Sequence, residues 1–135
     1  MAKILLIDDE PDLLELSQLT LESAGHEVQT LTQGARAVAV AADLCPQMIG
    51  LDWVIPDLSG EEVLRQLKAR PDTRRIPVLV MSALDNLDRQ VRRLGAVGVL
   101  AKPFGARSLI DTVAGVLAGG LRGHDAESTC AHARR

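Results

Sequence analysis

The strongest constraint on the fold of this 135-residue chain is an alternation, repeated five times, of a short apolar run with a longer amphipathic segment. The apolar runs occupy residues 3–7, 27–31, 47–51, 77–81 and 97–100. Most of them are continuously apolar, which is typical of strands buried on both faces of a parallel sheet. Strands that alternate with helices form such a sheet with helices on both of its faces. The pattern therefore predicts one α/β domain with a doubly wound parallel sheet of five strands.

A helix is predicted after each strand. The predicted helices cover residues 11–24, residues 35–42, a segment that starts after Ser59, residues 85–94 and residues 106–117. In the first helix we expect Leu13, Leu16 and Leu19 to form the stripe that faces the sheet. The fourth helix is charged almost all round, so we expect it to lie exposed at the surface.

Polar residues follow four of the predicted strands. Asp8 and Asp9 come directly after the first strand, Asp52 after the third and Ser82 after the fourth. Lys102 comes just after the last strand. Because ligands of open α/β sheets bind outside the carboxyl ends of the strands, we expect these five side chains to form one site.

Three carboxylates in one site indicate a bound cation. Asp8, Asp9 and Asp52 would repel one another without one, and a cluster of hard oxygen ligands suits Mg²⁺. Mg²⁺ also binds phosphate oxygens, and Lys102 supplies a complementary positive charge. A carboxylate can be the nucleophile in phosphoryl transfer. The residues therefore predict a phosphoryl-accepting aspartate, with Ser82 as a hydrogen-bond donor to the phosphoryl group.

Four motifs carry a resemblance to a known family. They are ILLIDDEP at residues 4–11, LDWVIPDLSG at residues 51–60, VLVMSA at residues 78–83 and GAVGVLAKPF at residues 95–104. Together they resemble the receiver domain of bacterial two-component response regulators, over about residues 2–119. The resemblance implies a flavodoxin-like (βα)5 fold with strand order 2-1-3-4-5, in which the first and third strands are neighbours.

The resemblance also implies a role for each site residue. Asp52 would receive a phosphoryl group from the phosphohistidine of a sensor histidine kinase or of a phosphotransfer protein. The direct Mg²⁺ ligands would be Asp9, Asp52 and the main-chain carbonyl of Val54, and Asp8 would act partly through water. Lys102 would contact the phosphoryl group, and Ser82 would be the switch residue. The Lys102–Pro103 bond would be cis. The only reactions expected are the phosphorylation of Asp52 and its autodephosphorylation, so the chain is not expected to be an enzyme.

Two departures from the family pattern leave alternatives open. Val99 stands where the family usually has Tyr or Phe, which puts the usual relay of the switch in doubt and leaves open a degenerate receiver that acts as a phosphorylation-independent interaction module. Ile55 replaces a common Met, a change that keeps apolar character. A hydrolase of the haloacid-dehalogenase type would use similar chemistry, but it normally has a second Asp where this chain has Val54.

Composition bears on the partners and on the location. The formal net charge of −3, with basic residues spread along the chain, predicts no direct DNA contact. No apolar stretch approaches the length of a membrane span, and two Cys residues are too few for a disulfide framework, so we expect a cytoplasmic protein. No output domain is recognised, so a separate effector protein is expected. The sequence leaves open a monomer or a phosphorylation-dependent homodimer.

The domain is expected to cover residues 1–119, with a flexible C-terminal tail at residues 120–135 that mixes Gly, His, Ser and charged residues. His124, Cys130 and His132 in this tail match no standard metal-ligand spacing. Trp53 follows Asp52, whose side chain is expected to face inward. Because side chains alternate along a strand, we expect Trp53 to point outward beside the acidic site.

Overall fold

A computed structural model describes residues 2–119 of the chain as a five-stranded parallel sheet with helices on both faces. The strand order is β2-β1-β3-β4-β5, as the family resemblance implied. The strands are β1 (Lys3–Ile7), β2 (Glu27–Leu31), β3 (Met48–Asp52), β4 (Val78–Ser82) and β5 (Gly98–Ala101). They match the predicted strands to within one residue at each end. Residues 120–135, where we expected a flexible tail, lie outside the part of the chain that is described.

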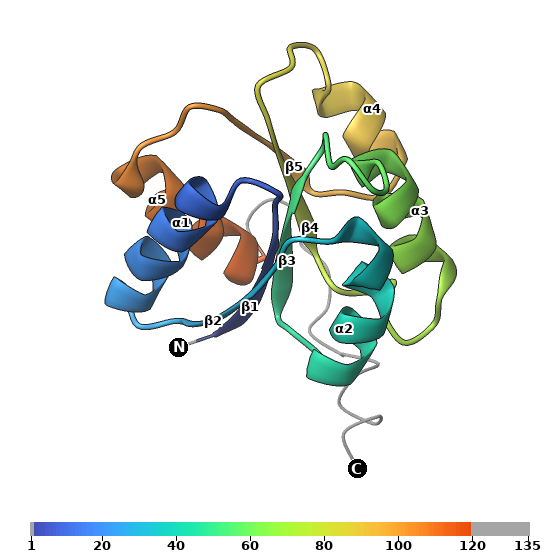
Figure 1. Cartoon of the computed structure of the whole chain (residues 1–135), viewed down its shortest axis with the longest axis horizontal. Coiled ribbons are helices and arrows are strands. Elements are labelled where there is room, and N and C mark those ends of the chain that lie inside the picture. Colours follow the sequence, from blue (N-terminus) through green and yellow to red (C-terminus); the bar gives the residue numbers. More distant parts are fainter. Residues whose placement is uncertain (1, 120–135) are drawn as a thin grey trace.

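The helices divide between the two faces of the sheet (Figure 1). On one side lie α1 (Pro11–Ser23) and α5 (Ala106–Leu117), and on the other lie α2 (Ala37–Leu44), α3 (Gly60–Ala69) and α4 (Asp88–Arg93). A short 3₁₀ helix, η1 (Gly34–Arg36), precedes α2. None of the described helices is long and apolar enough to span a membrane.

The fourth helix is shorter than predicted, since α4 begins at Asp88 where we expected residue 85. Asn86 has a φ of 63°, in the left-handed region, which a right-handed helix cannot include. Val91 of α4 is fully buried, although four of the other five residues of this helix are charged. The expectation of an exposed helix therefore holds for its charged residues, while one apolar residue attaches it to the core.

The prediction for the inner face of α1 was wrong. Leu14, Ser17 and Leu21 are the buried residues of this helix, whereas Leu16 and Leu19 have relative exposures of 61% and 56%. Leu14, Ser17 and Leu21 are spaced at i, i+3 and i+7, which places them on one helix face. Because α1 carries leucines around much of its circumference, composition does not identify the face that packs on the sheet. The buried stripe also contains the polar residue Ser17, so it does not stand out as an apolar pattern in the sequence.

Trp53 also lies differently from the prediction, because it is 8% exposed and belongs to the core on the side of α2 and α3. The strand β3 ends at Asp52, so the alternation of side chains no longer applies to the next residue. The Trp53 N–H donates to the Met81 carbonyl at 3.2 Å, and the Gly60 N–H donates to the Trp53 carbonyl at 2.8 Å. These bonds turn the chain toward α3, and the Trp53 side chain packs in the core on that side of the sheet.

Candidate functional site

The sheet topology brings Asp8, Asp9 and Asp52 together. Ile7 of β1 is paired with Leu51 of β3, so the acidic residues that follow each strand meet at the same edge. Each of the three carboxylates offers an oxygen that lies within 4.8 Å of the other two. Asp8 and Asp52 are buried and Asp9 is half-buried. The three acidic residues therefore form one cluster at the carboxyl ends of two adjacent strands.

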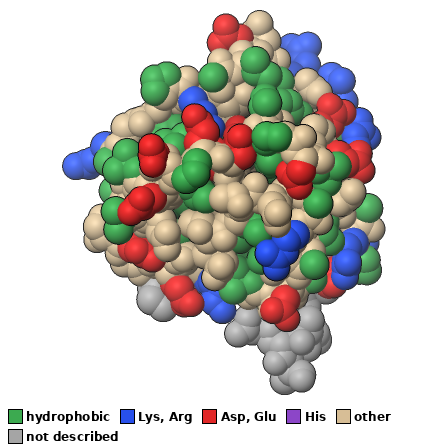
Figure 2. Space-filling view, viewed as in Figure 1, with side chains coloured by type: hydrophobic (Ala, Val, Ile, Leu, Met, Phe, Trp, Pro, Cys, Tyr) green, Lys and Arg blue, Asp and Glu red, His purple; other side chains and the backbone are tan. Residues whose placement is uncertain are grey.

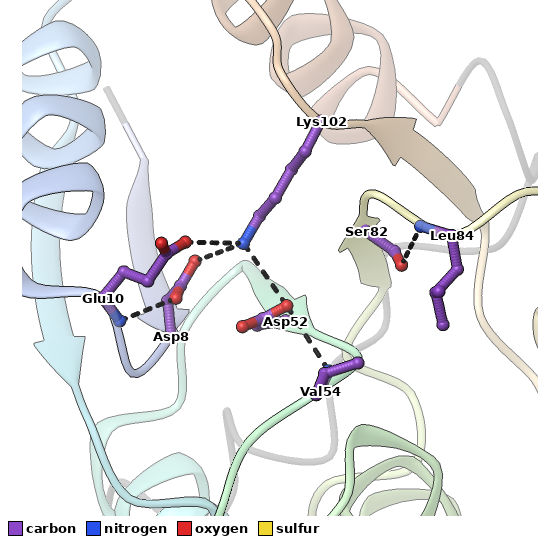
Figure 3. Close-up of polar contacts among 7 residues, drawn as sticks. All are labelled: Asp8, Glu10, Asp52, Val54, Ser82, Leu84 and Lys102. Carbon is purple, nitrogen blue, oxygen red and sulfur yellow. Dashed lines mark hydrogen bonds and ion pairs between the residues drawn. The ribbon is translucent and has the colours of Figure 1, made fainter.

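The side chain of Lys102 extends toward Asp8 and Asp52 of this cluster (Figure 3). Its Nζ is 3.0 Å from an Asp8 oxygen and 3.4 Å from Asp52 Oδ1. The Lys102 N–H donates to the Ser82 carbonyl at 2.8 Å, and the Lys102–Pro103 bond is cis, as the resemblance implied. The main chain after β5 is thus anchored to the end of β4, which leaves the lysine side chain to extend toward the acidic cluster.

Glu10 is a member of this site that the sequence did not identify. Its carboxylate lies 3.6 Å from Lys102 Nζ, and its main-chain N–H donates to Asp8 Oδ1 at 3.0 Å. The signal that could have identified it is its position directly after Asp8 and Asp9. Glu10 is exposed, so it adds negative charge at the rim of the cluster.

The environment of Asp52 opposes its ionised form. Burial raises the pKa of the Asp52 carboxyl to about 6, and the negative charge of Asp8 adds to this effect, while Lys102 and the Val54 N–H act in the opposite direction. Burial alone would lower the pKa of Lys102, but its hydrogen bond to Asp8 and the charges of Asp8 and Asp52 outweigh burial and raise it. Lys102 therefore stays protonated and partly neutralises the cluster.

The chain turns sharply away from the site after β3. Gly60, the first residue of α3, lies so close to β3 that a Cβ atom there would be 2.6 Å from the Asp52 carbonyl oxygen and from the Trp53 Cα. Only glycine allows this approach without movement of the main chain. Ser59 caps the helix by accepting a hydrogen bond from the Glu62 N–H at 3.2 Å. The start of α3 is therefore held directly beneath Asp52.

Ser82 lies at the end of β4 and is buried. Its Oγ accepts a hydrogen bond from the Leu84 N–H at 3.0 Å, within its own loop (Figure 3). The hydroxyl proton of Ser82 is not used in that bond, so the side chain keeps a donor. Ser82 therefore lies at the same edge of the sheet as Asp52, which is paired with Met81, while its side chain bonds within its own loop.

The rim of the site contains exposed apolar side chains. Val54 is 61% exposed and follows β3, and Leu84 is 53% exposed and follows β4. The space-filling view shows acidic side chains over the upper part of the visible face, with hydrophobic side chains among them (Figure 2). The rim thus combines negative charge with apolar surface.

The cluster of Asp8, Asp9 and Asp52 has the chemistry of a divalent-cation site. Its ligands are carboxylate oxygens only, which suits a hard cation such as Mg²⁺ better than a transition metal. Two of the three carboxylates are buried, where their mutual repulsion is poorly screened by solvent. Lys102 compensates one of the negative charges of the three carboxylates, and a cation of charge +2 would compensate the other two.

Comparisons with known proteins agree with this geometry. The family described as response regulator receiver domain matches residues 4–114. The chain is 36% identical over 121 residues to Protein PilH of Pseudomonas aeruginosa, covering 88% of this chain and 100% of PilH. It is 34% identical to the phosphate regulon transcriptional regulatory protein PhoB of Rhizobium meliloti, over 87% of this chain and 52% of PhoB. It thus spans about half the length of PhoB and of several other curated relatives.

Solved structures show the same fold. The chemotaxis response regulator CheY4 of Vibrio cholerae superposes with a TM-score of 0.81 at 29% identity, covering 86% of this chain and 98% of CheY4. The family match covers all four strand ends that build the acidic site and Lys102. The chain therefore belongs to the response regulator receiver domains of two-component signalling.

Proposed function

We propose that this chain is a phosphoacceptor response regulator of a two-component or phosphorelay system, with Asp52 as the acceptor. The observation that carries the proposal is the position of Asp52, a buried carboxylate within 4.8 Å of two other acids and 3.4 Å from Lys102. This arrangement is unfavourable for an aspartate with a purely structural role, because burial and the charge of Asp8 both oppose the ionised form of Asp52. The arrangement suits a carboxylate that gains a phosphoryl group.

In the proposed reaction, an Asp52 carboxylate oxygen attacks the phosphorus of a phosphohistidine on a sensor histidine kinase or phosphotransfer protein. The new P–O bond forms as the P–N bond of the phosphohistidine breaks, and the electron pair of that bond stays with the imidazole, which takes up a proton. Lys102, held by Asp8 beside Asp52, offers its ammonium to the phosphoryl oxygens. Hydrolysis of the aspartyl phosphate would return the site to its starting state.

Mg²⁺ is the proposed cofactor, with Asp9, Asp52 and the main-chain carbonyl of Val54 as direct ligands and Asp8 acting partly through water. When bound, it would neutralise negative charge on the cluster and on the transferring phosphoryl group. Two observations support this ligand set. The three carboxylates form one cluster, and the main chain of Val54 lies close to Asp52, since the Val54 N–H donates to Asp52 Oδ1 at 3.5 Å.

The proposed output is a change in protein contacts. Ser82 would turn its hydroxyl from the Leu84 N–H toward the phosphoryl oxygens and so alter the loop after β4. A separate effector protein would read that change in the cytoplasm, without direct DNA contact, and phosphorylation-dependent homodimerisation is a further outcome to be measured. The proposed receiver unit covers residues 1–119.

The test is intact mass after incubation with acetyl phosphate and Mg²⁺. We expect the wild type to gain the mass of one phosphoryl group and Asp52→Asn to gain none. The matched control is Asp111→Asn, a change of the same chemistry at an exposed residue of α5, which should be phosphorylated like the wild type. Absence of phosphorylation in the wild type, or an equal gain in Asp52→Asn, would overturn the proposal.

One observation favours a second candidate, a degenerate receiver that acts without phosphorylation. Val99 of β5 is half-buried and packs against the core on the side of α2, α3 and α4. A valine there has no aromatic ring that could move inward when Ser82 shifts. Binding of an effector with equal affinity to the phosphorylated and unphosphorylated forms would favour this candidate. Turnover of a small phosphate ester would instead indicate a hydrolase.

A further inference from the structure

A second aspartate on the loop after β3 holds that loop in place. Asp57 accepts hydrogen bonds from two successive main-chain N–H groups at the start of η1, with Oδ1 3.0 Å from the Gly34 nitrogen and Oδ2 2.9 Å from the Ala35 nitrogen. Both carboxylate oxygens are used, one for each donor. The N–H groups of Ala35 and Gly34 lower the pKa of Asp57. The carboxylate is therefore ionised at neutral pH and stays an acceptor for both bonds.

The two segments that Asp57 joins are in close contact. A Cβ atom at Gly34 would lie 2.9 Å from the Leu58 carbonyl oxygen and 3.2 Å from a methyl carbon of Val63. The segment between β2 and α2 thus packs directly against the loop formed by residues 53–59. Asp57 fixes their relative position by directional hydrogen bonds, in addition to this packing.

The loop that Asp57 holds carries the main chain of Val54. Asp8 and Asp52 are positioned by the pairing of β1 with β3, but Val54 lies two residues beyond the last paired residue of β3. The loop is attached at its ends, where the Trp53 N–H bonds Met81 and the Gly60 N–H bonds the Trp53 carbonyl. Between these two ends, the carboxylate of Asp57 connects the loop to η1.

The segment that Asp57 contacts is also close in the chain to a hydrogen-bond partner of Asp8. The Asp8 N–H donates to the carbonyl of Leu31, the last residue of β2, at 3.1 Å. Leu31 lies three residues before Gly34 in the chain. The end of β2 and the start of η1 therefore connect the main chain of Asp8 on one side with Asp57 on the other.

We propose that Asp57 is a positioning residue for the metal site: its bonds to Gly34 and Ala35 hold the loop of residues 53–59 so that the Val54 carbonyl can serve with Asp9 and Asp52. This inference rests on the proposed function, because it assumes Mg²⁺ at the acidic cluster. Asp57 touches neither the cation nor the phosphoryl group. It acts through the main chain, in the way that residues beyond the ligands orient a metal site.

The first experiment measures Mg²⁺ binding to Asp57→Ala by isothermal titration calorimetry. We expect the dissociation constant for Mg²⁺ to rise about tenfold, in the range found for residues that orient metal ligands. At saturating Mg²⁺, phosphorylation by acetyl phosphate should return to within about twofold of the wild-type rate, because Asp52 and Lys102 are unchanged. A purely structural role would instead lower thermal stability without this separation of metal affinity from rate.

A change of charge could also weaken Mg²⁺ binding, so two controls are needed. The difference between Asp57→Ala and wild type should persist in high salt, which screens the distant charge of Asp57. Ala35→Pro removes one of the two donors and leaves the charge of Asp57 unchanged. Proline is tolerated in a first helical turn, and the preceding Gly34 has no Cβ to clash with it.

We expect Ala35→Pro to weaken Mg²⁺ binding in the same direction as Asp57→Ala. The double variant should bind no more weakly than Asp57→Ala alone, because both changes break the same contact. Without metal, amide hydrogen exchange at Gly34 and at Ala35 should be faster in Asp57→Ala than in wild type.

The outcomes separate the two proposals. If wild type binds no Mg²⁺ and is not phosphorylated, the proposed function fails. If wild type binds Mg²⁺ and Asp57→Ala binds it equally well, the proposed function stands and the role of Asp57 is overturned. That second result would mean that the buried side chains of Trp53 and Ile55 hold the loop by themselves.

Discussion

At the scale of single residues, Asp52 is placed where its charge is unfavourable. Burial and the neighbouring Asp8 raise its pKa to about 6, although Lys102 lies 3.4 Å away. In the metal-free protein the folded state therefore binds a proton at Asp52 more readily than the unfolded chain does. The chemistry proposed for Asp52 requires this placement, because a carboxylate in solvent would lack the fixed positive charges that stabilise a phosphoryl group.

We predict that Asp52→Asn stabilises the metal-free protein at neutral pH. Below the ordinary pKa of 3.8 the acid is neutral in both states, so it contributes no charge penalty. The penalty grows as the pH rises from 3.8 and is complete above the folded-state pKa of about 6. We expect Asn to add about 1 to 3 kcal/mol near neutral pH. Urea unfolding in EDTA on both sides of this window measures it, and a gain that does not depend on pH would contradict it.

Lys102→Ala should separate folding from switching. The lysine side chain is paired with Asp8 and Asp52, but its main-chain bond to Ser82 is kept in the variant. We expect the variant to fold and to bind Mg²⁺ at least as tightly as wild type, since the ammonium no longer occupies the carboxylates. Phosphorylation should then fail to change amide exchange in the loop after β4. Calorimetry and hydrogen exchange test this, and an unfolded variant at room temperature would show that Lys102 is structural.

At the scale of secondary-structure elements, the loops that follow β3 and β4 decide what surrounds Asp52. Each presents an exposed apolar residue, Val54 in the first loop and Leu84 in the second. Hydrolysis of an aspartyl phosphate needs a water molecule in line with the phosphorus, and polar side chains near the acceptor can position it. Neither of these residues can form a hydrogen bond to water through its side chain.

We therefore predict a persistent phosphoryl state in wild type and faster dephosphorylation in the double variant Val54→Asn with Leu84→Glu. Both changes are at exposed positions, so they should leave the fold intact. The measurement is loss of the phosphoryl mass over time in excess Mg²⁺. The control is Val54→Leu with Leu84→Met, which changes the shape of both side chains and adds no hydrogen-bonding group. An unchanged or slower rate in the Asn and Glu variant would show that water access is controlled elsewhere.

The helix α1 offers a direct test of which of its faces supports the fold. Leu21 is fully buried against the sheet, whereas Leu16 is exposed. We expect Leu21→Ala to lower the free energy of unfolding by about 2 to 5 kcal/mol and Leu16→Ala by about 0.5 kcal/mol or less. Chemical denaturation of the two variants measures the difference. Equal losses would mean that the opposite faces of α1 contribute equally.

At the scale of the whole molecule, the sheet collects at one edge residues that lie far apart in the chain, since Asp8 and Lys102 are 94 positions apart and form a hydrogen bond. A ligand that binds this edge therefore connects β1, β3 and the segment after β5. It should stabilise the entire domain, because the folded state alone assembles the site.

We predict that Mg²⁺ raises the free energy of unfolding of wild type, by about 2.7 kcal/mol when its concentration reaches about 100 times the dissociation constant. Trp53, the single tryptophan, lies in the core beside Asp52 and should report both binding and unfolding by fluorescence. Asp9→Ala should lose the Mg²⁺ effect on both signals while unfolding normally without metal. Identical Mg²⁺ titrations of wild type and Asp9→Ala would exclude Asp9 as a ligand.

Much of the fold could be predicted from the sequence alone. Short apolar runs are typical of strands covered on both faces, and their alternation with longer amphipathic segments placed the strands to within one residue at each end. The polar residues at the strand ends predicted one site of Asp8, Asp9, Asp52, Ser82 and Lys102, because the carboxyl ends of parallel strands share one edge. The structure brings the three acids and Lys102 together, whereas the roles of all five residues stay predictions. The strand order itself came from the family motifs.

Only the tertiary structure decided which of several similar residues each contact uses. The leucines of α1 lie on more than one face, and packing on the sheet buried Leu14 and Leu21 instead of Leu16. The turn after β3 directed Trp53 into the core, because the strand ended at Asp52. The bonds of Asp57 to Gly34 and Ala35 join residues more than 20 positions apart. Local sequence records periodicity and strand ends, but contacts between distant loops depend on how the helices pack around the sheet.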